Sequence, residues 1–103
     1  MKEVKAIIKP FKLDAVLNAL HHIGNLPVVV VGEAQAIDTA QDLYEPVGVL
    51  KIEMMVPDEL VETVVGSIAE AAHTGNVGDG RIFVIPIEES VVIRTGERGE
   101  SAR

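Results

Sequence analysis

The sequence predicts an α+β domain of the ferredoxin-like type, with the element order βαββαβ. The chain has 103 residues, the size of one domain, and 48% of them are hydrophobic, so the chain can bury a core. Two stretches have apolar residues on one helical face, and four are rich in β-branched residues. The order in which these stretches alternate matches the split βαβ plan. We therefore expect a single domain over residues 1–103.

The first half of the chain predicts a strand, a helix and a second strand. The first strand covers Val4–Ile8 and ends before Pro10, because proline cannot donate a ladder hydrogen bond. From residue 12 the apolar positions share one helical face, and Gly24 ends the helix. These positions are Leu13, Val16, Leu17 and Leu20. The valine-rich stretch 27–36 predicts the second strand.

The second half of the chain predicts another strand and helix, followed by two further strands. Residues 49–56 form the third strand, and the acidic turn Pro57–Glu59 begins a helix that runs to about His73. A glycine-rich loop leads into the fourth strand over 81–86. Residues 90–93 predict a short fifth strand, and we expect a flexible polar tail over 95–103.

The face of the sheet that the helices leave uncovered is also expected to be buried. Strands 27–36 and 49–56 are apolar at successive positions, a pattern typical of strands covered on both faces. A monomer would expose a large apolar patch there, which soluble monomers rarely do. The sequence therefore predicts a homo-oligomer, although composition does not give its order.

Charge and composition exclude several functions. Sixteen acidic and nine basic residues give a net charge of -7, and no basic stripe could follow a phosphate backbone, so nucleic acid is not an expected partner. The chain has no cysteine, which excludes disulfides and thiolate metal sites. Its apolar runs are too short to span a membrane, and its first residues lack a signal-peptide core. A cytoplasmic location is the expectation.

The loop between the second helix and the fourth strand is the best candidate site. Its glycines let the backbone approach a ligand, its amides can cradle phosphate oxygens, and an arginine follows with a fork of donors. Asp79 caps the turn, or accepts a hydrogen bond from a ribose or from a neighbouring amide. On these residues alone, a tight connection without a ligand is the more common use of such a loop. The candidates are Thr74, Gly75, Gly78, Asp79, Gly80 and Arg81.

Other polar residues give weaker signals. Arg94, Arg98 and Arg103 could fold over a phosphate, but a solvated tail is the commoner use of such residues. His21 and His22 are adjacent on a helix and point in different directions, so they cannot easily chelate one ion. The sequence offers no nucleophile with a base and no carboxylate pair in a predicted cleft, and we do not expect an enzyme.

The stretch Thr74-x-x-x-Gly78-Asp79-Gly80-Arg81-Ile82-Phe83-Val84 resembles the C-terminal signature of the PII nitrogen-regulatory family. Residues 6–13, 51–53 and 93–99 are similar to PII as well, so the resemblance covers the chain except residues 38–48. It implies a homotrimer with the sheets inside and an adenine nucleotide in the clefts between subunits. Residues 74–81 would be the phosphate-contacting B-loop, and Arg94 would reach in from the adjacent chain. Met55 is placed among the nucleotide-binding residues with them.

The chain departs from this family pattern at three places. The long T-loop of the family is shortened to residues 38–48, and its tyrosine-containing modification motif is absent, so uridylylation is not expected. Val49 and Val92 stand where the family has a lysine and an arginine. Each change removes a charged contact worth roughly 1.5 to 3 kcal/mol. We expect ADP or AMP to bind better than ATP, and 2-oxoglutarate not to be sensed in the usual way.

These departures are similar to divergent PII-like proteins that serve membrane transporters or inorganic-carbon uptake. The resemblance therefore implies regulation of a transporter or enzyme, with bicarbonate as a possible second ligand. Two alternatives share the fold. A CutA-like metal-tolerance protein would bind a divalent metal through histidines and methionines. A phosphatase of the acylphosphatase type would need an anion loop after the first strand, where Lys9–Lys12 contains no glycine.

Overall fold

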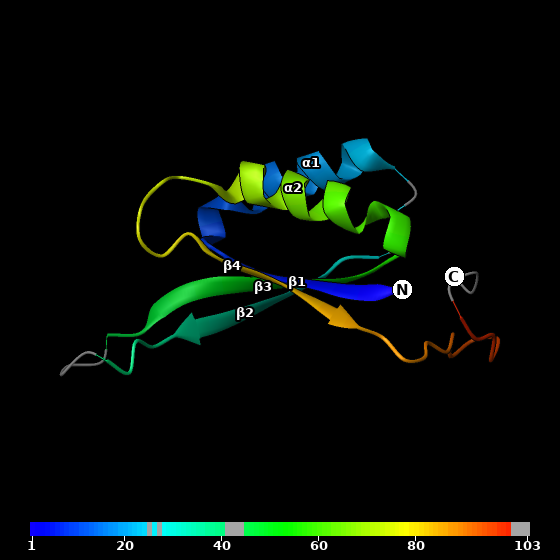
Figure 1. Ribbon diagram of the computed structural model, residues 1–103. Helices are drawn as coiled ribbons and strands as arrows, with labels where there is room; N and C mark the ends of the chain where they lie inside the picture. The colour runs from blue at the N-terminus through cyan, green and yellow to red at the C-terminus, as the bar shows by residue number, and fades with distance from the viewer. Residues whose placement is uncertain (25, 27, 41–44, 100–103) are drawn as a thin grey trace.

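The computed structural model describes residues 1–24, 26, 28–40 and 45–99. Within these ranges four antiparallel strands form one sheet in the order β2-β3-β1-β4. The strands are β1 (Lys2–Ile8), β2 (Val30–Ala36), β3 (Val47–Val56) and β4 (Gly80–Pro86). Helices α1 (Leu13–Ile23) and α2 (Val61–Ala72) both cover the same face of the sheet (Figure 1). The predicted βαββαβ order and ferredoxin-like fold are confirmed.

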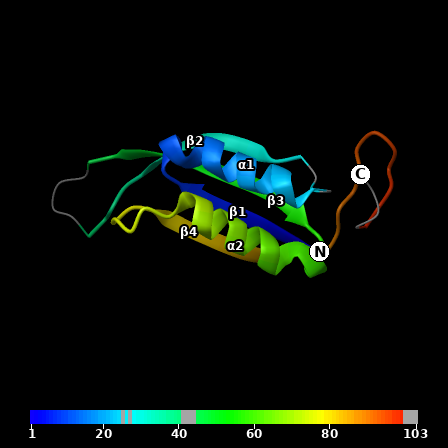
Figure 2. The ribbon, with the colours of Figure 1, turned by 90° about the horizontal axis from the view of Figure 1, so that it is seen from above.

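Each helix begins after a short 3-10 turn and buries one apolar stripe. The turns are Pro10–Lys12 before α1 and Asp58–Leu60 before α2. Helix α1 buries Val16 and Leu20 and ends at Gly24, whose φ of 73° suits glycine. Helix α2 buries residues spaced four apart, which lie on one face. Seen from above, the two helices lie side by side over the sheet and run roughly along its strands (Figure 2).

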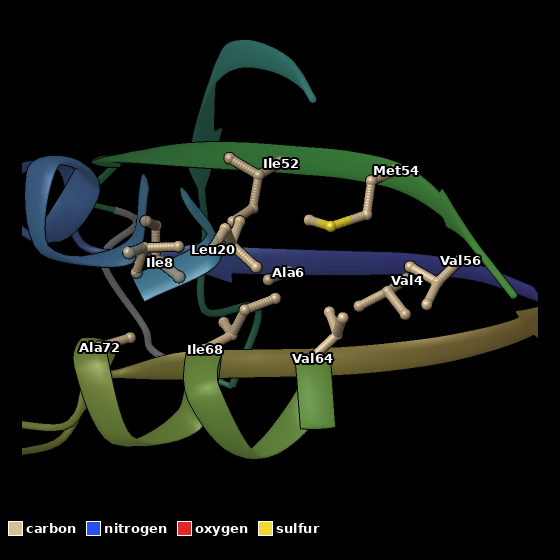
Figure 3. Close-up of a cluster of buried hydrophobic side chains, with 11 residues drawn as sticks. Val4, Ala6, Ile8, Leu20, Ile52, Met54, Val56, Val64, Ile68 and Ala72 are labelled. Atoms are coloured by element: carbon tan, nitrogen blue, oxygen red, sulfur yellow. The ribbon is translucent and has the colours of Figure 1, made fainter. Parts of the chain in front are cut away.

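The hydrophobic core lies between the helices and the sheet (Figure 3). Alternate residues of β1 and β3 point toward the helices, as the pleat of a strand requires. The register places Val4 opposite Met54 and Ala6 opposite Ile52, so these side chains share the covered face. The buried residues are Val4, Ala6, Ile8, Val16, Leu20, Ile52, Met54, Val56, Val64, Ile68 and Ala72.

The helix-free face is more mixed than the sequence suggested. The apolar runs alternate between faces, so the core takes every second residue and leaves Lys51, Glu53 and Met55 on the other side. Phe83 of β4 is 40% exposed and Val30 of β2 is 59% exposed there. In the single chain, the helix-free face of the sheet is exposed and carries both apolar and charged side chains.

The predicted fifth strand over 90–93 is wrong. This segment makes one isolated bridge, between Val91 and Arg98, because it leaves the sheet after β4 and finds no neighbouring strand in the chain. It folds back on itself instead. The amide of Val92 donates to the carbonyl of Glu97 at 2.9 Å, and the amide of Gly96 to the carbonyl of Val92 at 2.7 Å. Residues 100–103 of the expected tail lie outside the described residues.

All four strands begin at other positions than expected, and β1 begins at Lys2 rather than Val4 and β4 at Gly80 rather than Arg81. Strand β3 starts at Val47, since Val47 and Gly48 still pair with the end of β2. Strand β2 starts at Val30 rather than at residue 27, a position outside the described residues. Part of the expected loop 38–48 therefore pairs with β2 in the sheet. Residues 41–44 of this loop are also outside the described ranges.

The two ends of the sheet carry different segments of the chain. At one end Ile8 pairs with Gly80 and Leu50, so the loop before β4 and the β2–β3 connection begin there. At the other end Lys2 pairs with Pro86, and residues 87–99 continue beyond it (Figure 1). Strand β4 has seven residues, which places these ends about 20 Å apart. No helix in the described ranges is long and apolar enough to span a membrane.

Candidate functional site

The glycine-rich loop 74–80 joins α2 to β4 and is organised around the carboxylate of Asp79. One carboxylate oxygen, Oδ2, accepts hydrogen bonds from the backbone amides of Thr74 at 2.8 Å and Gly75 at 2.9 Å. The other, Oδ1, accepts from the hydroxyl of Thr74 and lies 3.1 Å from the ammonium of Lys9. Both oxygens are thus engaged, and Asp79 caps the turn.

The contacts of Asp79 favour its charged form. The hydrogen bond from the Thr74 hydroxyl, followed by those from the amides of Thr74 and Gly75, holds the pKa of Asp79 well below its ordinary value. The hydroxyl of Thr74 also accepts from the amide of Asn76 at 3.1 Å and from Lys9 Nζ at 3.2 Å. The side chains of Thr74 and Asp79 therefore face into the loop and hold it together.

Three consecutive backbone amides of this loop indicate a site for an anion. The backbone amides of Val77, Gly78 and Asp79 make no hydrogen bond to any residue in the described ranges. Val77 is fully exposed at the tip, and Gly78 has a φ of 90°. Successive free amides in such a turn form a concavity that suits phosphate or carboxylate oxygens.

The start of β4 requires a glycine and then presents a cation. A Cβ atom added at Gly80 would lie 1.7 Å from the carbonyl oxygen of Ile7, and the φ of Gly80 is 109°. Arg81 follows at once, exposed, at the register position opposite Ile7. The close approach of β4 to β1 therefore places the guanidinium two residues beyond the last free amide.

The predicted site residues fall into two groups at opposite ends of the sheet. The loop and Arg81 lie at the Ile8 end, beside a cavity of about 230 Å³ lined by Ile7, Ala72, His73 and Asp79 among others. Met55 pairs with Glu3 toward the other end, where a second cavity of about 420 Å³ is lined by Met55, Val30, Glu89 and Ser90 among others. One chain does not bring the two groups together.

Arg94 belongs to the second group. It lies in the turn that the Val91–Arg98 bridge closes, and it makes no ion pair within the described ranges. Arg98 is engaged instead, because its guanidinium binds the carboxylate of Glu89. Both arginines are exposed, but of the two only Arg98 has an ion-pair partner in the described part of the chain.

Sequence reasoning missed Lys9 as part of the site. Lys9 appeared only as part of the stretch after the first strand, and its partners Thr74 and Asp79 are far along the chain. A signal did exist, since a lysine directly after a strand lies at the same sheet edge as a loop that enters the neighbouring strand. The pairing of β1 with β4 is needed to see this.

The histidines do not form a metal centre in the described ranges. The rings of His21 and His22 meet edge to face at 5.9 Å, and Nδ1 of His22 lies 2.8 Å from the carbonyl oxygen of Asn18. His73 lies 3.9 Å from Asp79. The described residues contain no group of three or more His, Asp or Glu side chains that could hold a metal ion.

Comparison with known proteins gives one consistent result. The family model described as "Nitrogen regulatory protein P-II" matches residues 1–97. The nitrogen regulatory protein P-II of Azospirillum brasilense is 44% identical over 111 residues, covering 99% of both chains. Nitrogen regulatory protein P-II 1 of Escherichia coli strain K12 is 39% identical, also over 99% of both. The CutA-like alternative is not supported by these matches.

A solved structure agrees with the sequence relatives. The crystal structure of Arabidopsis thaliana PII bound to citrate superimposes with a TM-score of 0.85 at 39% identity, covering 98% of this chain and 87% of that chain. The 111 aligned positions of the relatives exceed the 103 residues of this chain, so the alignments contain gaps opposite it. This chain is therefore shorter than these relatives over the aligned region.

Proposed function

The chain belongs to the P-II nitrogen regulatory protein family, and on that premise we propose that it is a homotrimeric signalling protein that binds an adenine nucleotide. The observation that carries the proposal is the row of free amides at Val77, Gly78 and Asp79, next to Arg81. Amides and a guanidinium at one edge suit the phosphate oxygens of a nucleotide.

The nucleotide is held between two subunits. The phosphate-binding loop and Arg94 are separated in one chain by the length of β4, about 20 Å. A neighbouring subunit that packs against the helix-free face can place its own Arg94 and Met55 near the loop. The exposed apolar side chains of that face, such as Phe83 and Val30, would then be covered.

We expect ADP and AMP to bind better than ATP. Val49 stands on β3 opposite Ala34, at the same sheet end as the loop, and Val92 stands in the turn that carries Arg94. Both positions are apolar, so neither supplies a cation for a third phosphate. One missing charge-assisted hydrogen bond costs roughly 1.5 to 3 kcal/mol of binding free energy.

The regulated partner contacts the sheet end that carries the nucleotide loop. Ile37 and Val47 flank the β2–β3 connection and are 50% and 60% exposed, which suits docking to another protein. The shortened connection leads us to propose a membrane transporter or an inorganic-carbon system as partner, with bicarbonate as the second ligand. A nucleotide in the cleft would bias which form of the connection the partner meets.

Calorimetric titration tests the nucleotide proposal. The purified protein is titrated with ADP, AMP and ATP, each with and without bicarbonate and 2-oxoglutarate. We expect binding of ADP or AMP that Arg81→Ala and Arg94→Ala each abolish. Tight ATP binding enhanced by magnesium and 2-oxoglutarate would overturn the stated preference, and no nucleotide binding at all would overturn the function.

Mixing the two variants tests whether the site lies between subunits. Arg81→Ala and Arg94→Ala trimers are unfolded together, refolded as a mixture and titrated with ADP. A mixed trimer can combine an intact Arg81 from one subunit with an intact Arg94 from its neighbour, so partial binding should return. If the refolded mixture binds no more than either parent, the two arginines do not share a site across subunits.

A further inference from the structure

Lys9 directly follows β1, one of the two inner strands of the sheet, and connects the loop between α2 and β4 to that strand. We propose that Lys9, Asp79 and Thr74 form a latch that holds the free amides of Val77 and Gly78 in position for phosphate. Lys9 is then a positioning residue for the nucleotide and does not contact it. This inference rests on the proposed nucleotide-binding function.

The latch consists of polar contacts that close on one another. The ammonium of Lys9 lies 3.1 Å from Asp79 Oδ1 and 3.2 Å from Thr74 Oγ1, and the Thr74 hydroxyl donates to the same carboxylate. The side chains of Lys9 and Asp79 are 21% and 23% exposed. A half-buried ion pair that is also hydrogen-bonded is screened less by water than a surface pair.

The latch also fixes the place of the free amides. The Cε atom of Lys9 lies 3.7 Å from the position of a Cβ at Gly78, so the lysine stem packs beneath the turn. The link joins residues 65 apart in sequence and ties the loop to a strand whose Ala6 and Ile8 are buried in the core. The loop thus takes its position from the core of the sheet, not only from its own backbone.

The contacts indicate positioning rather than ligand binding. The carboxylate of Asp79 and the hydroxyl of Thr74 already use their hydrogen-bonding groups within the loop. The ammonium of Lys9 lies within hydrogen-bond distance of both of them. Removing Lys9 should therefore loosen the loop while leaving the nucleoside part of the site unchanged.

The first test measures the loop without nucleotide. Amide hydrogen exchange of residues 74–79 is compared in the wild type, Lys9→Met and Lys12→Met, a matched control at the next lysine in the sequence. Lys9→Met keeps the apolar stem and removes the charge, so exchange at Thr74 and Gly75 should accelerate. Unchanged exchange in Lys9→Met, or equal acceleration in Lys12→Met, would overturn the latch.

The second test compares ligands with and without phosphate. Lys9→Met should weaken ADP binding about ten-fold, because the loop loses one charge-assisted contact that holds it in position, while adenosine binds as in the wild type. Thr74→Val should weaken ADP in the same way, and Thr74→Ser should restore it because the hydroxyl returns. An equal loss for adenosine and ADP, or no rescue by serine, would overturn a positioning role.

The two tests separate the inference from its premise. If the wild-type protein binds no ADP, the proposed function is wrong, whatever happens to exchange. If the wild type binds ADP and Lys9→Met binds it equally well, the function stands and the positioning role of Lys9 is wrong.

Discussion

Asp79 shows how an acidic residue fits into a loop proposed to bind an anion. Its charge is met by the ammonium of Lys9 and by the amides of Thr74 and Gly75, so little of it faces the row of free amides. The carboxylate consumes the first amides of the loop and leaves the later ones free. The acid thereby separates the amides that hold the loop together from those that the proposed ligand would contact.

The pH dependence of the loop follows from the lowered pKa of Asp79. A group whose pKa is lower in the folded state stabilises that state above its unfolded pKa, and this contribution is lost as pH falls through the folded pKa. The ordinary pKa of an aspartate is 3.8, and Asp79 should therefore still be ionised at that pH. We expect NMR titration of its carboxyl carbon to show a midpoint well below 3.8. A midpoint near 3.8 would contradict the hydrogen-bonded loop.

The requirement for glycine at position 80 can be tested by substitution. In Gly80→Ala the new Cβ would meet the Ile7 carbonyl at 1.7 Å on a backbone with a φ of 109°, so β1 and β4 must separate. We expect the free energy of unfolding in urea to fall by at least about 2 kcal/mol. Gly32→Ala is the control, because nothing lies within 4 Å of its Cβ position. Equal stability of the two variants would show that the strands tolerate the side chain.

Among the helices and strands, the sequence predicted best the elements whose pattern lies within a single segment of the chain. Both helices show the spacing of a buried stripe, and the stripe residues Val16, Leu20, Val64 and Ile68 are indeed buried. The fifth strand over 90–93 failed because a strand depends on a partner, and apolar residues such as Val91 and Ile93 do not reveal whether one is present.

The candidate site was predictable to the same extent. Its glycines and Arg81 are close in sequence, so the loop could be identified before its shape was known. Lys9 could not, because its contact with Thr74 depends on the pairing of β1 with β4. Nor could the distance from Arg81 to Arg94 be seen, since sequence does not show at which end of a sheet a loop lies.

The packing of helix α2 against the sheet can be tested by substitution. Ile68 is fully buried between α2 and the sheet, so Ile68→Ala leaves a cavity and should lower the free energy of unfolding by about 2 to 5 kcal/mol. Glu70→Ala, two residues along the same helix, removes an exposed side chain and should change it little. Urea unfolding followed by circular dichroism measures both. If Ile68→Ala lowered the free energy of unfolding as little as Glu70→Ala, α2 would contribute little to the core.

At the scale of the whole molecule, the helix-free face combines apolar and charged side chains. A hydrogen bond between the side chains of Glu3 and Glu53 raises the pKa of Glu3, and Lys5 lies opposite Glu53 in the ladder. Charges that satisfy one another on the sheet can be covered by another subunit at lower cost than isolated ones. The mixed face is therefore compatible with the proposed trimer interior.

A charge placed on this face tests the assembly. Phe83→Glu should dissociate the proposed trimer, because a new carboxylate would be buried in the proposed interface, and its ladder neighbour Lys5 already lies opposite Glu53. Ala15→Glu introduces the same charge on the exposed side of α1 and should leave the trimer intact. Sedimentation velocity of both variants gives the masses. A trimeric Phe83→Glu protein would show that the subunits associate through another surface.

The distance between the two ends of the sheet also affects how the protein responds to its own abundance. Under the proposed function, a lone subunit holds only half of each pocket, so binding and assembly are coupled by mass action. Dilution below the dissociation point of the subunits would weaken the apparent affinity, and added nucleotide would draw the subunits back together. The protein would then register its own concentration in the cell together with the level of its nucleotide.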